Sequence, residues 1–302
     1  MNKPVVAVAL SGGIDSLVSG YMLKKKYKNV FGLHFTTGYE KNRTDVRLLE
    51  DQLGFPVTRI DLSETFEKYV IHYFINTYLA GKTPNPCMIC NKTIKFGVLL
   101  DHAGKMGADI LATGHYATIC NAVTSTGSYR DDAYLSKGDD PLKDQSYFLA
   151  LLSSEQLKHL LFPLAKMNKD EVRQFAKSHN IKPLYPSESQ DICFIHDNNF
   201  PRFIMEKIKT TPDHGDIVDG TGKVVGRHKG LHQYTIGQRR GLNCPASEPY
   251  YVKKIDVTTN QLEVCFKKNL QQQEFFVTDI NWNYSHTETI NPITVKIRYS
   301  HK

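Results

Sequence analysis

Three cysteines with unusual placement are the first residues in this chain that could do chemistry. Cys87 and Cys90 lie three positions apart in TPNPCMICNKTIKFG, at residues 83–97, and Cys193 stands far away in SESQDICFIHD. The two prolines before the pair fix their own φ and restrict the residues that precede them, so a stiff turn presents the thiols. A helix that begins beyond Cys90 would lower the pKa of its thiol and favour the thiolate. The spacing therefore indicates metal binding, a disulfide or sulfur chemistry.

Four interpretations of the paired thiols compete. A buried cysteine without a role is the default, and we assign it to the remaining three, Cys120, Cys244 and Cys265. Structural zinc needs four ligands, usually from two paired motifs, and only one CxxC is present. A persulfide relay through Cys90 and Cys193 requires no metal. An iron–sulfur cluster held by Cys87, Cys90 and Cys193 would leave one iron open to carry a sulfide, and we favour it because Cys87 is otherwise unexplained.

The segment SGGIDS, residues 11–16, is the second candidate site. It lies between a valine-rich apolar run and a segment with helical spacing. Gly12 and Gly13 lack Cβ atoms, so the backbone can approach a phosphate or pyrophosphate, which a helix N-terminus also favours. Asp15 would repel a bare phosphate, which indicates a divalent cation such as Mg²⁺ between them. A tight turn that merely requires glycine is the alternative, and the Walker pattern is absent.

Alternating strands and helices over the first third of the chain predict an α/β fold with a doubly wound parallel sheet. The expected strands cover residues 4–10, 29–35, 56–62 and 108–117, and the expected helices cover residues 17–27, 44–54, 63–80 and 91–106. Thr44 is the candidate N-cap of the second helix, and Gly54 is its expected stop. Ligands bind beyond the carboxyl ends of such strands. Residues 11–16, the chain after Phe35 and the TGHYA turn should therefore converge on one crevice.

Short alternating strands replace this pattern beyond about residue 205. We expect a hairpin around residues 219–222 and strands at residues 250–257, 261–267, 274–282 and 293–299. This pattern predicts a small β domain or barrel. The expected domains are a nucleotide-binding α/β domain at 1–205, a small central domain at 206–246 and a β-rich domain at 247–302.

Composition is that of a soluble globular protein. The chain has 302 residues, 40% of them hydrophobic, and a net charge of +7, a basic surplus that can steer a protein toward nucleic acid. Six cysteines are too few for a disulfide framework. No apolar run approaches the roughly 20 residues that span a bilayer. We expect a cytoplasmic protein without membrane contact.

Six motifs follow one another in a fixed order along nearly the whole chain: AVALSGGIDSLV, GKTPNPCMICNKTIKFG, ATGHYA, KDQSYFLALL, SQDICFI and YTIGQRRGL. Together they resemble the bacterial tRNA-specific 2-thiouridylases, the MnmA family of PP-loop ATP pyrophosphatases. The resemblance implies an ATP-binding catalytic domain with an adenine nucleotide α-hydrolase-like sheet, a small central tRNA-binding domain and an incomplete C-terminal β-barrel-like domain. It also implies that ATP adenylates C2 of the wobble uridine in tRNAs for Lys, Glu and Gln. Sulfur transfer then gives 2-thiouridine, AMP and pyrophosphate.

The resemblance also assigns individual residues. Asp15, Cys90 and Cys193 would be catalytic, with Cys193 bearing the persulfide in a metal-free route. The ATP contacts would be Ala9, Leu10, Ser11, Gly12, Gly13, Ile14, Asp15, Ser16, Phe35 and Gly114. The tRNA contacts would be Asn85, Pro86, Cys87, His115, Lys143, Asp144, Gln145, Arg298 and Tyr299. Many relatives carry Asp where this chain has Cys87, and the subgroup with CxxC and a distant cysteine uses a 4Fe–4S cluster on the equivalents of Cys87, Cys90 and Cys193.

The remaining expectations concern cofactors and partners. ATP and Mg²⁺ are the expected cofactors, with either the cluster or Cys90/Cys193 persulfide–disulfide chemistry. The expected partners are tRNA and a sulfur donor or sulfur-carrier protein, and the expected state is a monomer. Two other functions are weighed: a non-catalytic adenine-nucleotide and tRNA binder, and a PP-loop synthetase that acts on a small molecule.

Overall fold

A computed structural model describes residues 4–41, 43–123, 129–185, 192–209, 212–271, 273–283 and 294–299. Contacts within the chain divide it into two compact units. The first comprises residues 1–66, 87–190 and 280–302, and the second comprises residues 67–86 and 191–279. The domain boundaries expected at 205 and 246 stay predictions. No helix in the described part of the chain is long and apolar enough to cross a bilayer.

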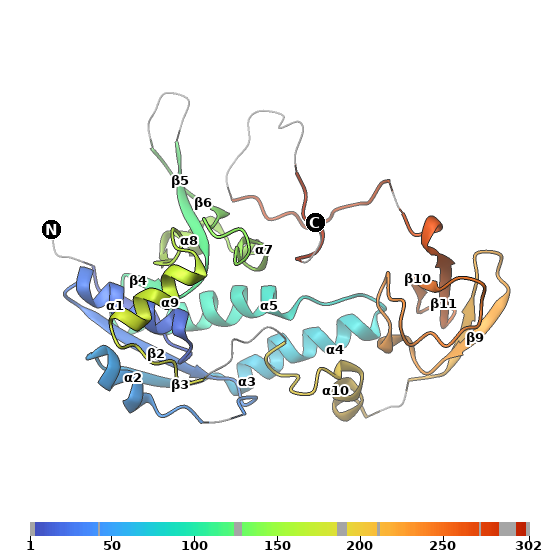
Figure 1. The fold of residues 1–302 in the computed structure, drawn as a ribbon, viewed down its shortest axis with the longest axis horizontal. Helices are drawn as coiled ribbons and strands as arrows, with labels where there is room; N and C mark the ends of the chain where they lie inside the picture. The colour runs from blue at the N-terminus through green and yellow to red at the C-terminus, as the bar shows by residue number, and fades with distance from the viewer. Residues whose placement is uncertain are drawn as a thin grey trace. The chain divides into compact units, whose positions relative to one another are not determined.

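A five-stranded parallel sheet in the order β3-β2-β1-β4-β7 is the frame of the first unit (Figure 1). Its strands are β1 (Val6–Ala9), β2 (Val30–Thr36), β3 (Val57–Asp61), β4 (Ile110–Ala112) and β7 (Leu160–Leu161). The central strand is fully buried at Val6 and Val8, as a parallel sheet covered on both faces requires. The predicted parallel sheet is therefore confirmed.

The strand expected at residues 108–117, with a Gly-His turn at its end, is β4 (Ile110–Ala112). β4 ends at Ala112, and β5 (Ala117–Val123) leaves the sheet to pair with β6 (Tyr129–Lys137) in an antiparallel hairpin (Figure 1). The intervening residues include Gly114 and His115, which form a turn rather than strand. This break puts the turn at the carboxyl end of β4, where ligands of parallel sheets bind.

Helices of the first unit include α1 (Ile14–Lys26), α2 (Val46–Leu53), α3 (Ser63–Phe66), α6 (Leu99–Lys105), α7 (Ser146–Leu149), α8 (Ser154–Lys158) and α9 (Lys169–Ser178). Of these, α1, α2 and α9 share one apolar core with the sheet. Leu17 of α1, Leu49 of α2 and Val172 of α9 are completely buried in one cluster with the β1 valines. The N-cap of α2 is Asp45, not the predicted Thr44, because the Asp45 side chain accepts from the Arg47 N–H. Gly54 ends α2 at φ 64°, as predicted.

The helix expected at residues 91–106 begins earlier than predicted. α5 (Pro86–Ile89) leads into the π-helical stretch η2 (Cys90–Val98) and then into α6. Proline is well suited to the first helical position, where its missing N–H would have no partner. Cys87 and Cys90 therefore lie inside the helix, and the expectation of a helix that begins beyond Cys90 is wrong.

The second unit contains a four-stranded sheet in the order β10-β11-β8-β9. Its elements are η1 (Glu67–Ile71), α4 (His72–Leu79), α10 (Phe200–Lys207), β8 (Gly215–Val218), β9 (Val224–His228), η3 (Leu231–Gln233), β10 (Tyr250–Asp256), β11 (Gln261–Phe266) and η4 (Lys267–Asn269). β8 and β9 form the predicted hairpin, with the Asp219 N–H donating to the Lys223 carbonyl. Ile217, Val252 and Leu262 are fully buried between these elements.

Two strands expected near the end of the chain are not found. Residues 273–283 and 294–299 form no strand in the described structure, although their apolar pattern fits one. A strand requires a hydrogen-bonded neighbour, and Phe276 is instead 100% exposed. The part of this segment that belongs to the first unit is held by side-chain hydrogen bonds. Asn281 donates to the Ala150 and Leu152 carbonyls at 2.9 and 2.7 Å, and Tyr147 donates to the Ile297 carbonyl at 3.1 Å.

Candidate functional site

The loop of residues 11–16 joins β1 to α1 in a conformation suited to an anion. Gly12 has φ +83°, and Gly13 is the N-cap of α1 with no side chain to occupy the first amide groups of the helix. The Ser16 hydroxyl donates to the Gly13 carbonyl at 2.9 Å and lies 3.3 Å from the Ser11 N–H, so the loop closes around it. The uncapped N–H groups and the helix dipole together suit a phosphate, and its binding here stays a prediction.

The turn after β4 packs directly on this loop. A Cβ atom at Gly114 would lie 2.7 Å from the Asp15 carbonyl carbon and 2.9 Å from the Ser16 nitrogen, which only glycine avoids. Residues 11–16 and the TGHYA turn therefore meet as predicted. The predicted contact of Gly114 with ATP stays a prediction.

Asp15 is held by two residues that the sequence did not reveal. The Tyr116 hydroxyl donates to Asp15 Oδ1 at 2.6 Å, and Lys169 Nζ lies 2.8 Å from both carboxylate oxygens. The Lys169 side chain is only 6% exposed. Lys169 is the first residue of α9, which begins with a capping box of Asn168 and Glu171, and its N–H donates to buried Asp140 at 3.0 Å. Lys169 is 154 residues and Tyr116 is 101 residues from Asp15, so no local pattern could have indicated them.

The fit of Asp15 to a divalent cation can be judged from its lone pairs. A carboxylate offers about four acceptor sites, and Tyr116 and Lys169 use three of them. The residual site suits a hard cation such as Mg²⁺, which usually takes one or two carboxylates and keeps several waters. Asp15 can therefore supply one oxygen to the expected Mg²⁺, although the Lys169 ammonium beside it opposes a second positive charge, and Mg²⁺ binding here stays a prediction.

His34 supports the beginning of the loop from the neighbouring strand. Its Nδ1 lies 2.8 Å from the Leu10 carbonyl oxygen, so Nδ1 must be the donor and Nε2 carries the lone pair. Burial lowers the pKa of His34, and the hydrogen bond to Leu10 opposes this effect. Phe35 follows in β2 and points to the opposite face of the sheet, paired in register with Ile60. The predicted contact of Phe35 with ATP stays a prediction.

The thiol pair lies on one helical segment of the first unit. Cys87 is exposed and Cys90 is partly buried. Although the Cys87 side chain reaches solvent, the surrounding protein desolvates its thiolate and so raises the pKa of the Cys87 thiol. The charge of Lys95 opposes this effect and is the smaller of the two. Cys87 by itself is thus a poor nucleophile at neutral pH. The preceding predicted base contacts are Asn85, whose N–H donates to Tyr73 at 3.3 Å, and buried Pro86.

Cys193 belongs to the second unit. It is exposed in a turn in which the Ile195 N–H donates to the Ile192 carbonyl at 3.0 Å. The next residue, Phe194, packs its ring on Phe74 of α4 at 5.2 Å and so anchors the turn. Among the described residues no group of three His, Cys, Asp or Glu side chains is placed to hold a metal. The three-cysteine ligand set stays a prediction.

His115, a predicted tRNA contact, is packed between aromatic rings. Its ring lies 5.5 Å from that of Phe96 and 5.7 Å from that of Phe162, and its Nδ1 lies 2.7 Å from the Thr113 hydroxyl. Burial, and then the Lys95 charge, lower the pKa of His115 well below 6.5. The ring is therefore neutral at pH 7, so any contact with RNA would be a neutral hydrogen bond or stacking contact rather than a phosphate ion pair.

Residues 143–145 brace the start of α7. Buried Asp144 accepts from the Gly138 and Ser146 N–H groups at 3.2 and 3.1 Å. Gln145 exchanges two hydrogen bonds with the Tyr116 backbone, at 2.8 and 3.0 Å. Both side chains thus have internal structural roles, while the predicted RNA contacts of Lys143, Asp144 and Gln145 are not tested.

The last predicted tRNA residues lie against the same helix. The Tyr299 ring is 4.6 Å from that of Phe148 in α7, and Lys296 lies 4.8 Å from the Tyr299 ring. Arg298 and Tyr299 were expected within the C-terminal β domain. Both instead lie outside any strand, because the predicted strand at residues 293–299 does not form in the described residues, and Tyr299 lies beside α7. The structure thus gathers residues 143–145 and Tyr299 around one short helix.

Comparison with known proteins agrees with the six motifs. A family model described as tRNA methyl transferase HUP domain matches residues 4–197, and one described as tRNA methyl transferase PRC-barrel domain matches residues 201–266. The tRNA-specific 2-thiouridylase MnmA of Desulfosudis oleivorans is 44% identical over 99% of this chain and 82% of its own length. The tRNA-specific 2-thiouridylase MnmA of Geotalea uraniireducens is 41% identical over 98% of this chain and 82% of its own.

Similarity to solved structures is weaker. A predicted subunit of tRNA methyltransferase from Methanocaldococcus jannaschii matches 58% of this chain and 74% of its own with 22% identity and a TM-score of 0.38. The relatives, by contrast, match along nearly the whole chain and most of their own length. The chain therefore belongs to the MnmA family of tRNA-specific 2-thiouridylases.

Proposed function

We propose that this protein converts the wobble uridine of tRNAs for Lys, Glu and Gln to 2-thiouridine in an ATP-dependent reaction. The observation that carries the proposal is 44% identity over 99% of the chain to a tRNA-specific 2-thiouridylase, together with the uncapped glycine loop at the N-terminus of α1. A net charge of +7 suits a nucleic-acid substrate. Because the substrate is tRNA, the cytoplasm is the proposed location.

The reaction requires activation because an amide-like oxygen is a poor leaving group. The C2 oxygen of the uridine attacks the α-phosphorus of ATP, and pyrophosphate leaves. A sulfur nucleophile then attacks C2, and AMP leaves with the original oxygen. The Gly12 and Gly13 amides are placed to hold the pyrophosphate end, and Mg²⁺ would neutralise phosphate charge beside Asp15. Lys169 orients the Asp15 carboxylate for this role.

The sulfur route divides into two chemistries that share Cys90 and Cys193. We favour a 4Fe–4S cluster held by Cys87, Cys90 and Cys193, which would supply sulfide at its open iron. Support comes from the spacing of Cys87 and Cys90, because the persulfide route gives Cys87 no role. The alternative is a persulfide on Cys193 with Cys90 as its resolving thiol. A sulfur donor or carrier protein supplies either route, and the monomer is the proposed state.

RNA contacts are proposed for two further groups of residues. Asn85, Pro86 and Cys87 would surround the target base, which such enzymes draw from its stack to reach an interior atom. The second group comprises the residues near α7 and the turn after β4: His115, Lys143, Asp144, Gln145, Arg298 and Tyr299. Of the proposed domains, 1–205 and 247–302 carry these contacts, and 206–246 is the proposed small central tRNA-binding domain.

A reconstitution with full-length protein, tRNA transcript, ATP, Mg²⁺ and a sulfide source tests the function. We expect 2-thiouridine and one pyrophosphate per modified base. Asp15→Ala should abolish pyrophosphate release, whereas Cys193→Ser should stop thiolation and still release pyrophosphate. Cys120→Ser is the matched control and should keep both activities. Labelled methyl donor is run in parallel because the family models are described as methyl transferase domains, and methylated tRNA without thiolation would refute the proposal.

Anaerobic purification separates the two sulfur routes. The cluster route predicts a brown protein with about four irons per chain, and loss of iron in Cys87→Ser as well as in Cys90→Ser and Cys193→Ser. Full thiolation by iron-free protein, unaffected by Cys87→Ser, would establish the persulfide route instead.

A further inference from the structure

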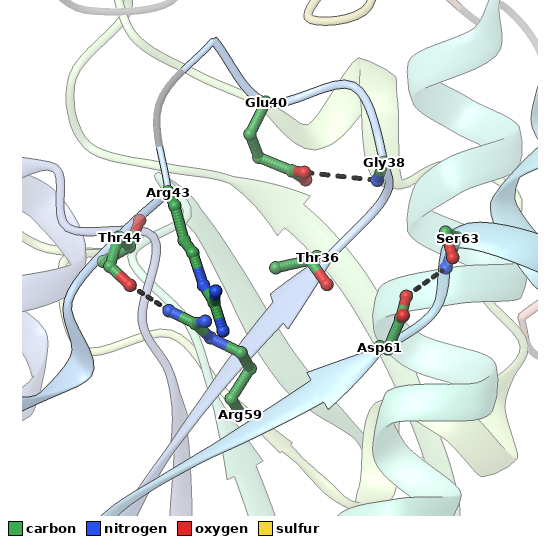
Figure 2. Close-up of a pocket in the computed structure, with 8 residues that line it drawn as sticks. All are labelled: Thr36, Gly38, Glu40, Arg43, Thr44, Arg59, Asp61 and Ser63. Atoms are coloured by element: carbon green, nitrogen blue, oxygen red, sulfur yellow. Dashed lines mark hydrogen bonds between the residues drawn. The ribbon is translucent and has the colours of Figure 1, made fainter.

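A cavity of about 330 Å³ opens at the carboxyl ends of β2 and β3 (Figure 2). Thr36 and Asp61 face each other in the register of the two strands, and Arg59 precedes Asp61 on the same face of β3. The loop after β2 adds Glu40 and Arg43. The chemistry of thiolation described above uses none of these five residues.

The two carboxylates of the cavity are engaged by nearby backbone and side-chain donors. Glu40 accepts from the Thr37 N–H at 2.6 Å, from the Thr37 hydroxyl at 2.8 Å and from the Gly38 N–H at 3.2 Å. Asp61 accepts from the Ser63 N–H at the start of α3 at 2.9 Å, and hydrogen bonds with Ser63 lower the pKa of Asp61. Across the described residues, neither carboxylate forms an ion pair with an arginine of the cavity.

The two arginines, in contrast, have donors to spare. Arg59 gives one Nη2 hydrogen bond to the Thr44 carbonyl, while its Nε–H is buried without a partner. Arg43 makes no hydrogen bond or ion pair in the described part of the chain, and Figure 2 shows its side chain pointing toward the guanidinium group of Arg59. The two guanidinium charges repel each other, and the buried Nε–H of Arg59 lacks a hydrogen-bond acceptor. An anion bound between the two side chains would relieve both costs.

We propose that this cavity binds one phosphate and the adjoining ribose of an RNA backbone. Guanidinium groups bind phosphate oxygens bidentately, so Arg43 and Arg59 would hold the phosphate. Figure 2 shows Asp61 and Ser63 on the opposite side of the cavity, where a carboxylate and a hydroxyl can bond the ribose 2′-OH. The volume is at the lower end of ligand pockets, which suits a single nucleotide unit.

The place of the cavity agrees with an RNA substrate and so rests on the proposed function. The Thr44 hydroxyl, in the cavity wall, lies 2.5 Å from the Tyr185 hydroxyl. The Tyr185 ring in turn covers Gly12 of the nucleotide loop, since a Cβ at Gly12 would lie 3.2 Å from it. A phosphate in the cavity would therefore be separated from the nucleotide loop by one packed side chain, and RNA bound here would pass beside the reaction site.

Binding of a full-length tRNA transcript to the full chain, without ATP, tests the proposal. Fluorescence anisotropy at several KCl concentrations gives both the affinity and its salt dependence. Loss of a charge-assisted phosphate contact should weaken binding about tenfold in Arg43→Ala, and the slope of log K against log[salt] should fall by about 1. Arg59→Gln should act in the same direction. Arg47→Ala is the control, because Arg47 is 80% exposed on α2, pairs with Asp45 and lies outside the cavity.

Each outcome decides the assignment. Equal slopes for Arg43→Ala and the wild type, or the same fall in Arg47→Ala, would overturn it. Arg43 is exposed, so Arg43→Ala keeps the test valid if Arg59→Gln fails to fold. Titration with inorganic pyrophosphate distinguishes the two sources of phosphate. If Arg43→Ala loses pyrophosphate binding but keeps the wild-type salt dependence of tRNA binding, the cavity is a product site and the RNA assignment is overturned. A wild-type protein that binds tRNA through Arg43 but forms no 2-thiouridine would refute the proposed function and leave the cavity assignment intact.

Discussion

Gly114 makes the closest backbone packing in the nucleotide site, and Gly114→Ala is the most direct perturbation of it. The added Cβ would lie 2.7 Å from the Asp15 carbonyl carbon and 2.9 Å from the Asp15 oxygen and the Ser16 nitrogen. Carbon atoms pack at about 3.5–4.0 Å, so the loop or the turn must move by about 1 Å. Displacement of about 1 Å at a reaction site can cost roughly 100-fold in rate. We expect a loss of about that size in tRNA-dependent pyrophosphate release.

Gly104→Ala is the matched control for this change. Gly104 lies in α6, and a Cβ there would meet nothing within 4 Å. Alanine in a helix interior is favoured over glycine by about 0.5–1 kcal/mol, so this variant should be at least as stable as the wild type and fully active.

Pyrophosphate release and thermal unfolding are then measured for all three proteins. Overpacking predicts that Gly114→Ala also loses about 1–3 kcal/mol of unfolding free energy while remaining folded. A folded Gly114→Ala enzyme that releases pyrophosphate at the wild-type rate would refute the reasoning, because the loop would then tolerate displacement.

Two further substitutions test buried charge and buried histidine. Lys169→Met removes the ammonium partner of Asp15, so we expect urea titrations to show about 2 kcal/mol less unfolding free energy, together with loss of pyrophosphate release. Lys177→Met, at an exposed lysine of the same helix, is the control. Wild-type stability of Lys169→Met would mean that the ion pair contributes nothing. His232 is 2% exposed, neither ring nitrogen has a partner among the described residues, and burial lowers the pKa of His232 below 6.5. Below pH 6.5 the unfolded chain protonates this histidine more readily than the folded chain does. Protonation therefore favours the unfolded state, and His232 lowers the free energy of unfolding as the pH falls. His232→Phe should reduce the loss of stability between pH 7.5 and pH 5.5 in urea unfolding, and an unchanged pH dependence would contradict the assignment.

The fold was predictable where neighbours in sequence decide the structure. The apolar run at residues 4–10, the glycines after it and the stop at Gly54 correctly indicated a parallel sheet with a nucleotide loop, because buried strands and left-handed helix ends require those residue types. The errors occurred where two local solutions compete. Asp45 rather than Thr44 caps α2, since the buried Thr44 hydroxyl lies 2.5 Å from the Tyr185 hydroxyl and contacts it instead.

Strand prediction failed where pairing partners decide. The apolar alternation at residues 274–282 is typical of a strand, but no neighbouring strand pairs with it in the described residues, and Phe276 is fully exposed. Helix prediction near the thiols failed by only one turn, because Pro86 was read as part of a stiff turn whereas it opens the helix.

The sequence by itself determined the glycine loop, the order of strands and helices around it, the spacing of Cys87 and Cys90, and membership of a family defined by motifs along the whole chain. Only the tertiary structure decided that Lys169 neutralises Asp15, that Gly114 packs on the loop, and that Arg43 and Arg59 share one cavity. The physical reason is range. Caps, turns and periodicity are set by residues a few positions apart, whereas the partners of a buried charge are chosen by which strand ends meet at one edge of the sheet.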